Sequence, residues 1–309
     1  MYTTVKKERK LSSEERINRL DINTSVSYPN GSKKVIRMNS TYLEIDDGMY
    51  RKRGLMSFFG FFAVGGIGVV IIFILYNAFY QYLDPNWDHH DEFELLWTTL
   101  FSITISFLFL FGCIAFLREI GECFRYTHYP IRFNRKNRMV YVFRGDNTIL
   151  SIPWDEVYFT ILYKRGKYSS YNIYGLVMRD LETVKEVFNF VVFETSKYEC
   201  LQYWEFTRLY MEKGIPSVMK ASDLKYYLPI ADKYETIFQS WKALTLDYEE
   251  MPIFRAIITP LLILAFIGRF IHRWTSKIPI WPKEIENECK IEQNDPYIFD
   301  SRKNPEGYR

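Results

Sequence analysis

Two long apolar stretches dominate the first 120 residues of the chain. No charged side chain occurs from Gly54 to Leu83 or from Leu95 to Leu117. A helix rises about 1.5 Å per residue and the hydrocarbon core of a bilayer is about 30 Å thick. Each stretch is therefore long enough to cross a membrane. The pattern predicts transmembrane helices at residues 55–83 and 95–117, joined by a short acidic loop at 84–94.

The charges around these stretches are unequally distributed. Basic residues precede the first stretch and end in the run Arg51-Lys52-Arg53, and more basic residues follow the second stretch. The loop between them carries acids and histidines but no Lys or Arg. Because Lys and Arg concentrate on the cytoplasmic side of membrane proteins, the pattern predicts a transmembrane hairpin with both termini in the cytoplasm.

Residues 1–54 are predicted to form a loosely ordered cytoplasmic segment. Tyr28-Pro29-Asn30-Gly31-Ser32 has the composition of a turn or linker. Val35 to Ile45 alternates weakly between apolar and polar residues. This stretch is interpreted either as one strand or as a tether on the membrane face.

After the hairpin, residues 129–214 alternate short β-rich runs with turns. The predicted strands are 131–133, 139–143, 148–152, 157–163, 171–178 and 186–193. An amphipathic helix follows at Lys197–Lys213, with Ser196 as its cap and Gly214 at its stop. Antiparallel strands closed by a C-terminal helix predict a pleckstrin-homology-like module. The fold class is therefore an α+β membrane protein: a two-helix hairpin, a small antiparallel β module and a helical tail.

The tail, residues 215–309, contains a further apolar run at 256–268 with Pro260 inside it. Thirteen residues are few for a span, and a third crossing would carry Arg273, Lys277 and Lys283 to the far side, against the charge bias. Two interpretations remain open. The run forms an interfacial helix with a basic flank, or a helix buried against the β module.

Composition alone would hide the hairpin. A hydrophobic fraction of 48% and a mean hydropathy of −0.17 are typical of soluble proteins, because the polar part dilutes the apolar stretches. The net charge of +3 gives no support for nucleic-acid binding. The four cysteines are scattered without a Cys-x-x-Cys pair, which predicts free, reduced thiols.

The acidic loop contains residue types that bind metals. Neighbouring ligand types in one short loop do not make a closed site, which needs three or four ligands in fixed geometry. The loop is interpreted as a solvated acidic cap that could meet a partner, without a metal. Its candidate contact residues are Asp88, His89, His90 and Asp91.

Glycines inside the first stretch favour close helix packing within the hairpin or between copies of the chain. They are Gly60, Gly65, Gly66 and Gly68.

Two basic groups are candidates for binding a partner or anionic lipid headgroups. The first is the run before the hairpin, Arg51, Lys52 and Arg53; the second is a predicted turn with Lys164, Arg165 and Lys167. The alternative for the second group is an ordinary exposed hairpin turn. No nucleophile elbow, phosphate loop or zinc-protease motif is present in the sequence, so neither an enzyme nor a cofactor is predicted.

Several phrases resemble known families. One phrase is similar to the sequence that leads into a strand in bacterial pleckstrin-homology-like domains that follow a two-helix membrane hairpin. It is Ile152-Pro153-Trp154-Asp155-Glu156-Val157. The other phrases resemble an uncharacterised family of two-span inner-membrane proteins of Gram-negative bacteria, associated with type VI secretion and effector gene clusters. They are Met38 to Tyr42, Pro130 to Lys136, Thr275 to Glu286 and Asn294 to Tyr297.

The resemblance implies a setting in the bacterial inner membrane and transfers no functional residue. It leads to the hypothesis of a non-enzymatic interaction protein whose partner is an effector or secretion component, in an immunity or accessory role. The alternative is a membrane-anchored module that senses anionic lipids. The two differ in salt dependence, because headgroup binding weakens with ionic strength and an apolar protein interface does not.

Overall fold

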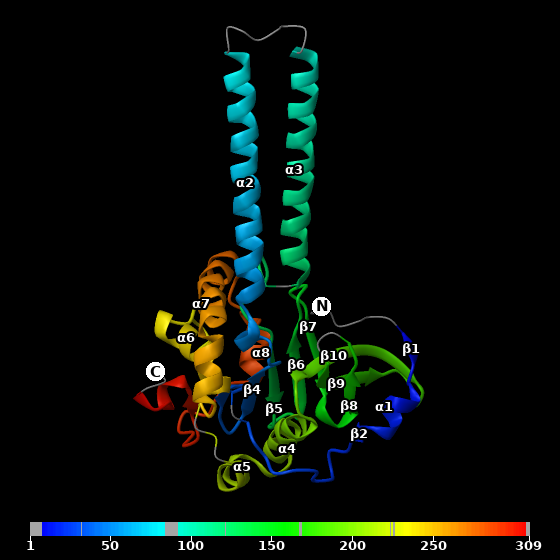
Figure 1. Cartoon of the computed structure of the whole chain (residues 1–309). Helices are drawn as coiled ribbons and strands as arrows, with labels where there is room; N and C mark the ends of the chain where they lie inside the picture. Colours follow the sequence, from blue (N-terminus) through cyan, green and yellow to red (C-terminus); the bar gives the residue numbers. More distant parts are fainter. Residues whose placement is uncertain are drawn as a thin grey trace. The chain divides into compact units, whose positions relative to one another are not determined.

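The computed structural model describes residues 8–306, apart from residues 32, 84–91, 121, 167–168, 223 and 225. The chain forms two compact units (Figure 1). Unit 1 contains residues 53–125 and 256–276. Unit 2 contains residues 2–52, 126–255 and 277–309. The described residues form an α+β structure with eight helices and two antiparallel sheets.

Unit 1 is built from three long apolar helices. They are α2 (Leu55–Tyr82), α3 (Glu92–Ile120) and most of α7 (Pro252–Thr275). All three are long and apolar enough to cross a membrane. Helices α2 and α3 pack side by side along much of their length. Helix α7 is longer than the run predicted at 256–268, and it continues through Pro260.

Unit 2 contains both sheets. The five-stranded sheet has the order β1-β10-β9-β8-β2, and the six-stranded sheet has the order β11-β3-β4-β5-β6-β7. The strands are β1 (Arg9–Lys10), β2 (Arg19–Leu20), β3 (Val35–Met38), β4 (Tyr42–Asp46), β5 (Pro130–Asn134), β6 (Met139–Phe143), β7 (Ile149–Pro153), β8 (Val157–Lys164), β9 (Ser170–Met178), β10 (Thr183–Glu194) and β11 (Phe299–Asp300).

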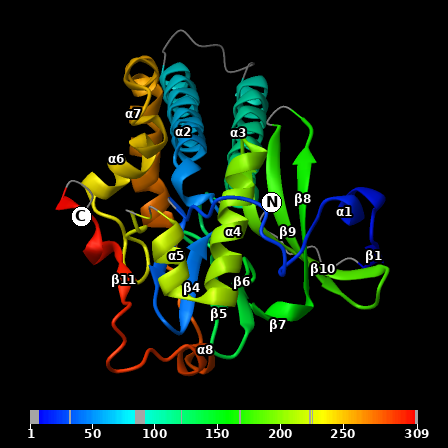
Figure 2. The same ribbon diagram turned by 90° about the horizontal axis from the view of Figure 1, so that it is seen from below.

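The smaller helices of unit 2 surround the sheets (Figure 2). They are α1 (Ser13–Ile17), α4 (Lys197–Lys213), α5 (Ile215–Ala221), α6 (Ile237–Thr245) and α8 (Lys283–Glu288). Helix α4 begins after Ser196, whose hydroxyl accepts the Tyr198 N–H, and ends at Gly214 with φ +77°. Both ends match the prediction from sequence.

Helix α4 covers the main core, where it contacts strands β5, β9 and β10. Trp204 of α4 stacks on Trp154 with ring centroids 5.8 Å apart, and both side chains are fully buried. The Trp154 indole donates a hydrogen bond of 2.8 Å to Glu212. The sequence Ile152-Pro153-Trp154 thus ends β7 and supplies the central aromatic ring of the core.

The six-stranded sheet extends further towards the N-terminus than the sequence predicts. Strands β3 and β4 precede the long helices, yet β4 pairs along its whole length with β5, from Tyr42↔Asn134 to Asp46↔Pro130. Residues 35–46 are therefore part of the β module and not a separate tether. The predicted boundary at 129 misses them because the partner strand lies about 90 residues further along the chain.

Candidate functional site

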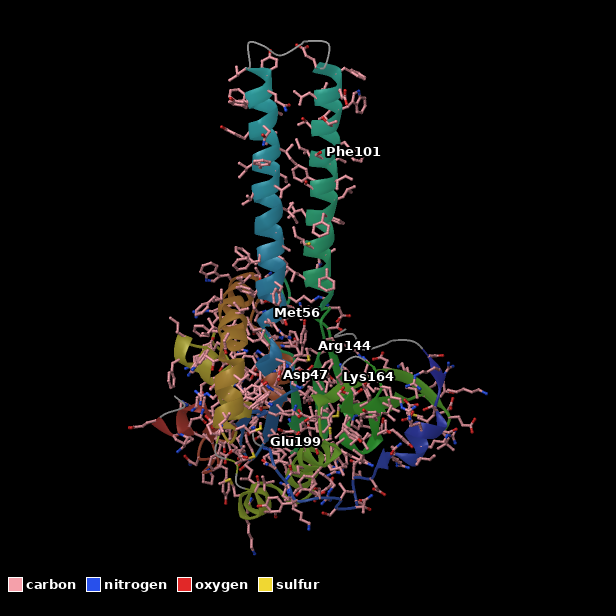
Figure 3. All side chains as sticks on the ribbon, viewed as in Figure 1. Asp47, Met56, Phe101, Arg144, Lys164 and Glu199 are labelled. Carbon is pink, nitrogen blue, oxygen red and sulfur yellow. The ribbon has the colours of Figure 1, made fainter. Side chains whose placement is uncertain are left out.

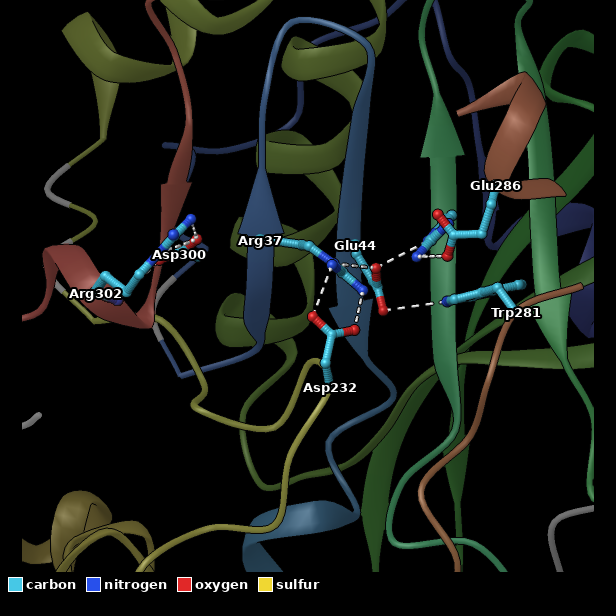
Figure 4. A network of polar contacts seen from close by, with 8 residues as sticks. Arg37, Glu44, Asp232, Trp281, Glu286, Asp300 and Arg302 are labelled. Carbon is cyan, nitrogen blue, oxygen red and sulfur yellow. Dashed lines mark hydrogen bonds and ion pairs between the residues drawn. The ribbon is translucent and has the colours of Figure 1, made fainter. Parts of the chain in front are cut away.

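A buried ionic network joins three strands of the six-stranded sheet to the C-terminal part of the chain (Figure 4). Glu44 on β4 is its centre. Its carboxylate accepts hydrogen bonds of 2.7 Å from Arg37 on β3 and 2.9 Å from Arg132 on β5. The Trp281 indole donates to its other oxygen at 3.3 Å. Glu44 and Arg132 are fully buried, so each charge depends on the other.

The network sets the ionisation of Glu44. Burial by itself would raise the pKa of this carboxyl, but the Arg132 and Arg37 guanidinium groups outweigh burial and hold the pKa at about 2. Arg132 also lies between two aromatic rings, 4.7 Å from the Tyr42 centroid and 4.6 Å from the Trp281 centroid. These contacts fix β4 and β5 to the segment that follows α7.

A solvent-open cavity of about 340 Å³ lies beside this network. Arg37 lines it and pairs with Asp232 at 3.2 Å; Arg302 also lines it and pairs with Asp300 at 2.6 Å. An anionic ligand would therefore compete with carboxylates already in place. Apolar side chains of Met38, Ile298 and Phe299 complete part of the lining.

A second buried charge cluster surrounds the segment that leads into α2. Lys34 bonds Glu194 at 2.7 Å, and both side chains are nearly inaccessible. Arg51 pairs with Asp247, and Lys52 donates to the Phe193 carbonyl. Arg51 is buried, whereas Lys52 is exposed. Of these two predicted headgroup-binding residues, the structure thus leaves Lys52 accessible and places Arg51 in an internal ion pair.

The third residue of that run, Arg53, belongs to unit 1 and is fully buried. Its guanidinium lies 3.3 Å from His272 Nε2, and its carbonyl accepts from Arg269 at 3.5 Å. The other ring nitrogen of His272 contacts the Glu122 carbonyl. That pairing assigns the proton to Nδ1, which leaves Nε2 to accept from Arg53.

Glu122 joins the end of α3 to the start of α2. One carboxylate oxygen accepts from the Ser57 N–H and hydroxyl, both at 2.8 Å, and from the Gly54 N–H at 3.2 Å. Gly54 has no side chain to cap the helix, so Glu122 takes over that function and places a negative charge at the positive end of α2. We call Arg53, Ser57, Glu122 and His272 the polar clamp.

The predicted basic turn lies between β8 and β9. Lys164 ends β8 opposite Ser170, and Figure 3 shows its position. Lys164 and Arg165 are exposed, and within the described part of the chain neither forms an ion pair. The third predicted residue of this turn, Lys167, lies outside the described residues, as do Asp88, His89, His90 and Asp91 of the acidic loop.

The described residues offer little reactive chemistry. Among them, no group of three or more His, Cys, Asp or Glu side chains could hold a metal ion. Burial raises the pKa of the Cys200 thiol to about 12, so the thiol stays protonated at neutral pH. Cys123 and Cys289 are also buried and free.

The burial of Arg51 and Arg53 could not be predicted from the sequence. The residues that they contact, Asp247 and His272, are more than 65 residues away along the chain.

Comparisons with known proteins place the chain in a family without indicating its chemistry. Neither the curated proteins nor the solved structures give a match to it. Residues 106–293, more than half of the chain, match a family model described as a family of unknown function (DUF6708). This result is consistent with the resemblance of the sequence to an uncharacterised family, and the chain belongs to DUF6708.

Proposed function

We propose that the protein is a non-enzymatic, membrane-anchored interaction protein of the bacterial inner membrane. Helices α2 and α3 form its transmembrane hairpin, and unit 2 is a cytoplasmic, pleckstrin-homology-like module. The partner is a protein of the effector or secretion-component class, which the family resemblance suggests, and the protein acts on it in an immunity or accessory role.

The pairing of β4 with β5 is the main observation that supports the proposed transmembrane hairpin. The chain leaves unit 2 after Lys52 and returns at Tyr126. The strands on either side of this excursion are neighbours in one sheet, with Asp46 opposite Pro130. Any membrane crossings between them must therefore be even in number. Two apolar helices of 28 and 29 residues fit that requirement, with side chains such as Phe101 standing out from them (Figure 3).

The polar clamp supports the same proposal. Backbone N–H groups at the start of a helix have no partner inside the helix. Near a bilayer such groups are costly unless another group satisfies them. Glu122 supplies that partner for α2 from just beyond α3, which ties the two ends of the hairpin together.

A second candidate function rests on the exposed basic turn. Lys164 and Arg165 are accessible and could bind anionic headgroups. In this version the module senses lipid rather than a protein. The two hypotheses predict different salt dependence of binding. A headgroup contact through exposed charges weakens at high salt, because charges are screened over about 8 Å already at physiological ionic strength.

Affinity purification from solubilised membranes, followed by mass spectrometry, tests the proposal. The wild type is compared with a Lys164→Glu, Arg165→Glu variant. A Lys185→Glu, Lys220→Glu variant is the control, because it makes the same charge change at two other exposed lysines. We expect a stoichiometric protein partner with the wild type and with the control, retained at high salt.

Recovery of anionic lipid alone, lost in the Lys164→Glu, Arg165→Glu variant and at high salt, would favour lipid sensing. If no protein partner appears with any variant, the interaction proposal is wrong.

A further inference from the structure

Helix α7 carries an apolar stripe whose side chains are exposed or only partly buried. Side chains at steps of three and four residues share one face of a helix. The stripe consists of Ile257, Pro260, Leu264, Ile267, Ile271 and Trp274. Ile257 is 71% exposed and Trp274 is 85% exposed. A different face is buried and includes Ala265, Arg269 and His272.

The connections of α7 argue against a third membrane crossing, although its length and hydropathy would allow one. Before the helix, Leu246 packs with Ile36 and Tyr50 in the core of unit 2. After the helix, the Lys277 carbonyl accepts from the Thr127 N–H, and Trp281 packs into another cluster of the same unit. A single helix whose two flanks both belong to one compact unit cannot cross the bilayer once, because the flanks would then lie on opposite sides.

Within unit 1, α7 crosses α2 at a single place. Gly268 packs directly against the Gly54 carbonyl, where any larger side chain would collide. Gly54 in turn lies against the Ala265 carbonyl. Contacts along the rest of the two helices are few, so α7 does not run beside α2 as α3 does. The crossing point is the first turn of α2, at the end held by the polar clamp.

We propose that α7 is an in-plane helix of the cytoplasmic membrane interface, with its apolar stripe inserted between lipids. This inference rests on the proposed hairpin and adds a second lipid-binding surface to it. The occupant of the stripe is lipid rather than protein, because α7 contacts the start of α2 through Gly268, and α2 exposes the apolar side chains of Phe59 and Phe61, at 51% and 55%, one turn further on.

The remaining composition of α7 fits an interfacial position. Trp274 lies near one end, and tryptophan prefers the headgroup level of a bilayer. Arg255 and Arg273 fall on neither the stripe nor its flanks, so they can stay in the headgroup and water region. Helix α7 therefore resembles an amphipathic interfacial helix more than a transmembrane helix, which would be apolar on all sides.

Depth-dependent fluorescence quenching tests the inference in the full-length protein. Single cysteines replace Ile257, Leu264 or Trp274 in a Cys113→Ala background, since the other native cysteines are buried. Each variant is labelled with a fluorophore and reconstituted into vesicles of phosphatidylcholine and phosphatidylglycerol. The quencher is a doxyl lipid carrying its nitroxide either near the headgroup or near the end of the acyl chain.

Two further labels act as controls. Ile72→Cys lies near the centre of α2 and is 68% exposed, so it reports whether α2 spans. Tyr198→Cys lies on α4 of unit 2 and is 58% exposed, so it reports quenching outside the bilayer.

We expect all three α7 labels to be quenched about twofold more by the shallow nitroxide than by the deep one, as for a helix buried about 5–10 Å into the interface. The Ile72 label should show the reverse preference, and the Tyr198 label should show neither.

Deep quenching at Leu264 with shallow quenching at Ile257 and Trp274 would make α7 a third span and overturn the inference. No lipid quenching on α7, with Ile72 deep, would mean that protein covers the stripe, which overturns the inference and leaves the hairpin intact. If Ile72 lacks deep quenching, the proposed membrane anchoring fails instead.

Discussion

The two units of the chain distribute polar and apolar groups in opposite ways. Unit 2 has an apolar core, and its buried charges are held in pairs such as Glu44 with Arg132. Unit 1 exposes large apolar side chains along α2 and α3, for example Phe73 and Phe101 at 65% and 66%. Its buried polar groups gather at one end, where Glu122 caps α2.

This difference fits the proposed membrane anchoring through unit 1. Monomeric soluble proteins rarely expose apolar patches as long as α2 and α3. In lipid, such surfaces are stable as long as every backbone polar group is satisfied, which a helix achieves internally. The same reasoning separates α7 from α2, because α7 has a polar side and α2 has none.

The largest expected effect concerns the buried charges of unit 2. Glu44→Ala leaves Arg37 and Arg132 without their shared carboxylate, and removing one partner of a buried pair costs about 3–5 kcal/mol. Asp232→Ala is the matched control, because it also contacts Arg37 but its side chain is 77% exposed; its cost should stay below about 1 kcal/mol. Denaturant unfolding of the full chain in detergent measures both. Equal costs would show that the network does not stabilise unit 2.

The next effect tests the apolar surface of unit 1. Ile72→Arg places a charge at the centre of α2, where insertion scales assign a cost of about 2.5–3.5 kcal/mol. Ile257→Arg makes the same change on α7, where a long side chain can reach the headgroups. We expect membrane integration, measured by resistance to alkaline extraction, to fall strongly for Ile72→Arg and little for Ile257→Arg. The reverse order would contradict the distinction between the two helices.

Acid should destabilise unit 2 through Glu44. Its pKa is about 2 in the folded protein and 4.5 for the free group, so its contribution is complete above about pH 4.5 and is lost as the pH falls towards 2. The difference corresponds to about 3 kcal/mol. Stability measured against pH should therefore decline in this window for the wild type, and the slope should be shallower for Glu44→Gln. Identical slopes would assign the acid sensitivity to other carboxylates.

The smallest effect concerns the polar clamp. Glu122→Ala removes the acceptor for the Ser57 and Gly54 N–H groups, and an unsatisfied buried donor costs about 1–3 kcal/mol. Glu122→Gln retains an acceptor oxygen and should recover part of the loss. Thermal unfolding of the detergent-solubilised protein compares the two variants. If Glu122→Ala is neutral, water replaces the carboxylate and the clamp does not hold the helices.

The sequence predicts local elements well where a local signal exists. The long helices at 55–82 and 92–120 follow from unbroken apolar runs, and α4 follows from Ser196, its apolar stripe and Gly214. Strand β6 matches its predicted bounds, and β7 and β8 match to within one residue. Each of these depends on neighbouring residues. Helix α7 is longer than the predicted run at 256–268, because it continues through Arg255 at one end and Arg269 and Arg273 at the other.

The sequence by itself therefore determined the apolar helices, most strands and the family resemblance of this protein. Only the tertiary structure decided that β4 pairs with β5 across the two helices and that Arg51 and Arg53 are buried. It also decided that α7 leaves and rejoins unit 2. The physical reason is that periodicity and capping are local, whereas strand pairing and charge burial depend on partners that are distant along the chain.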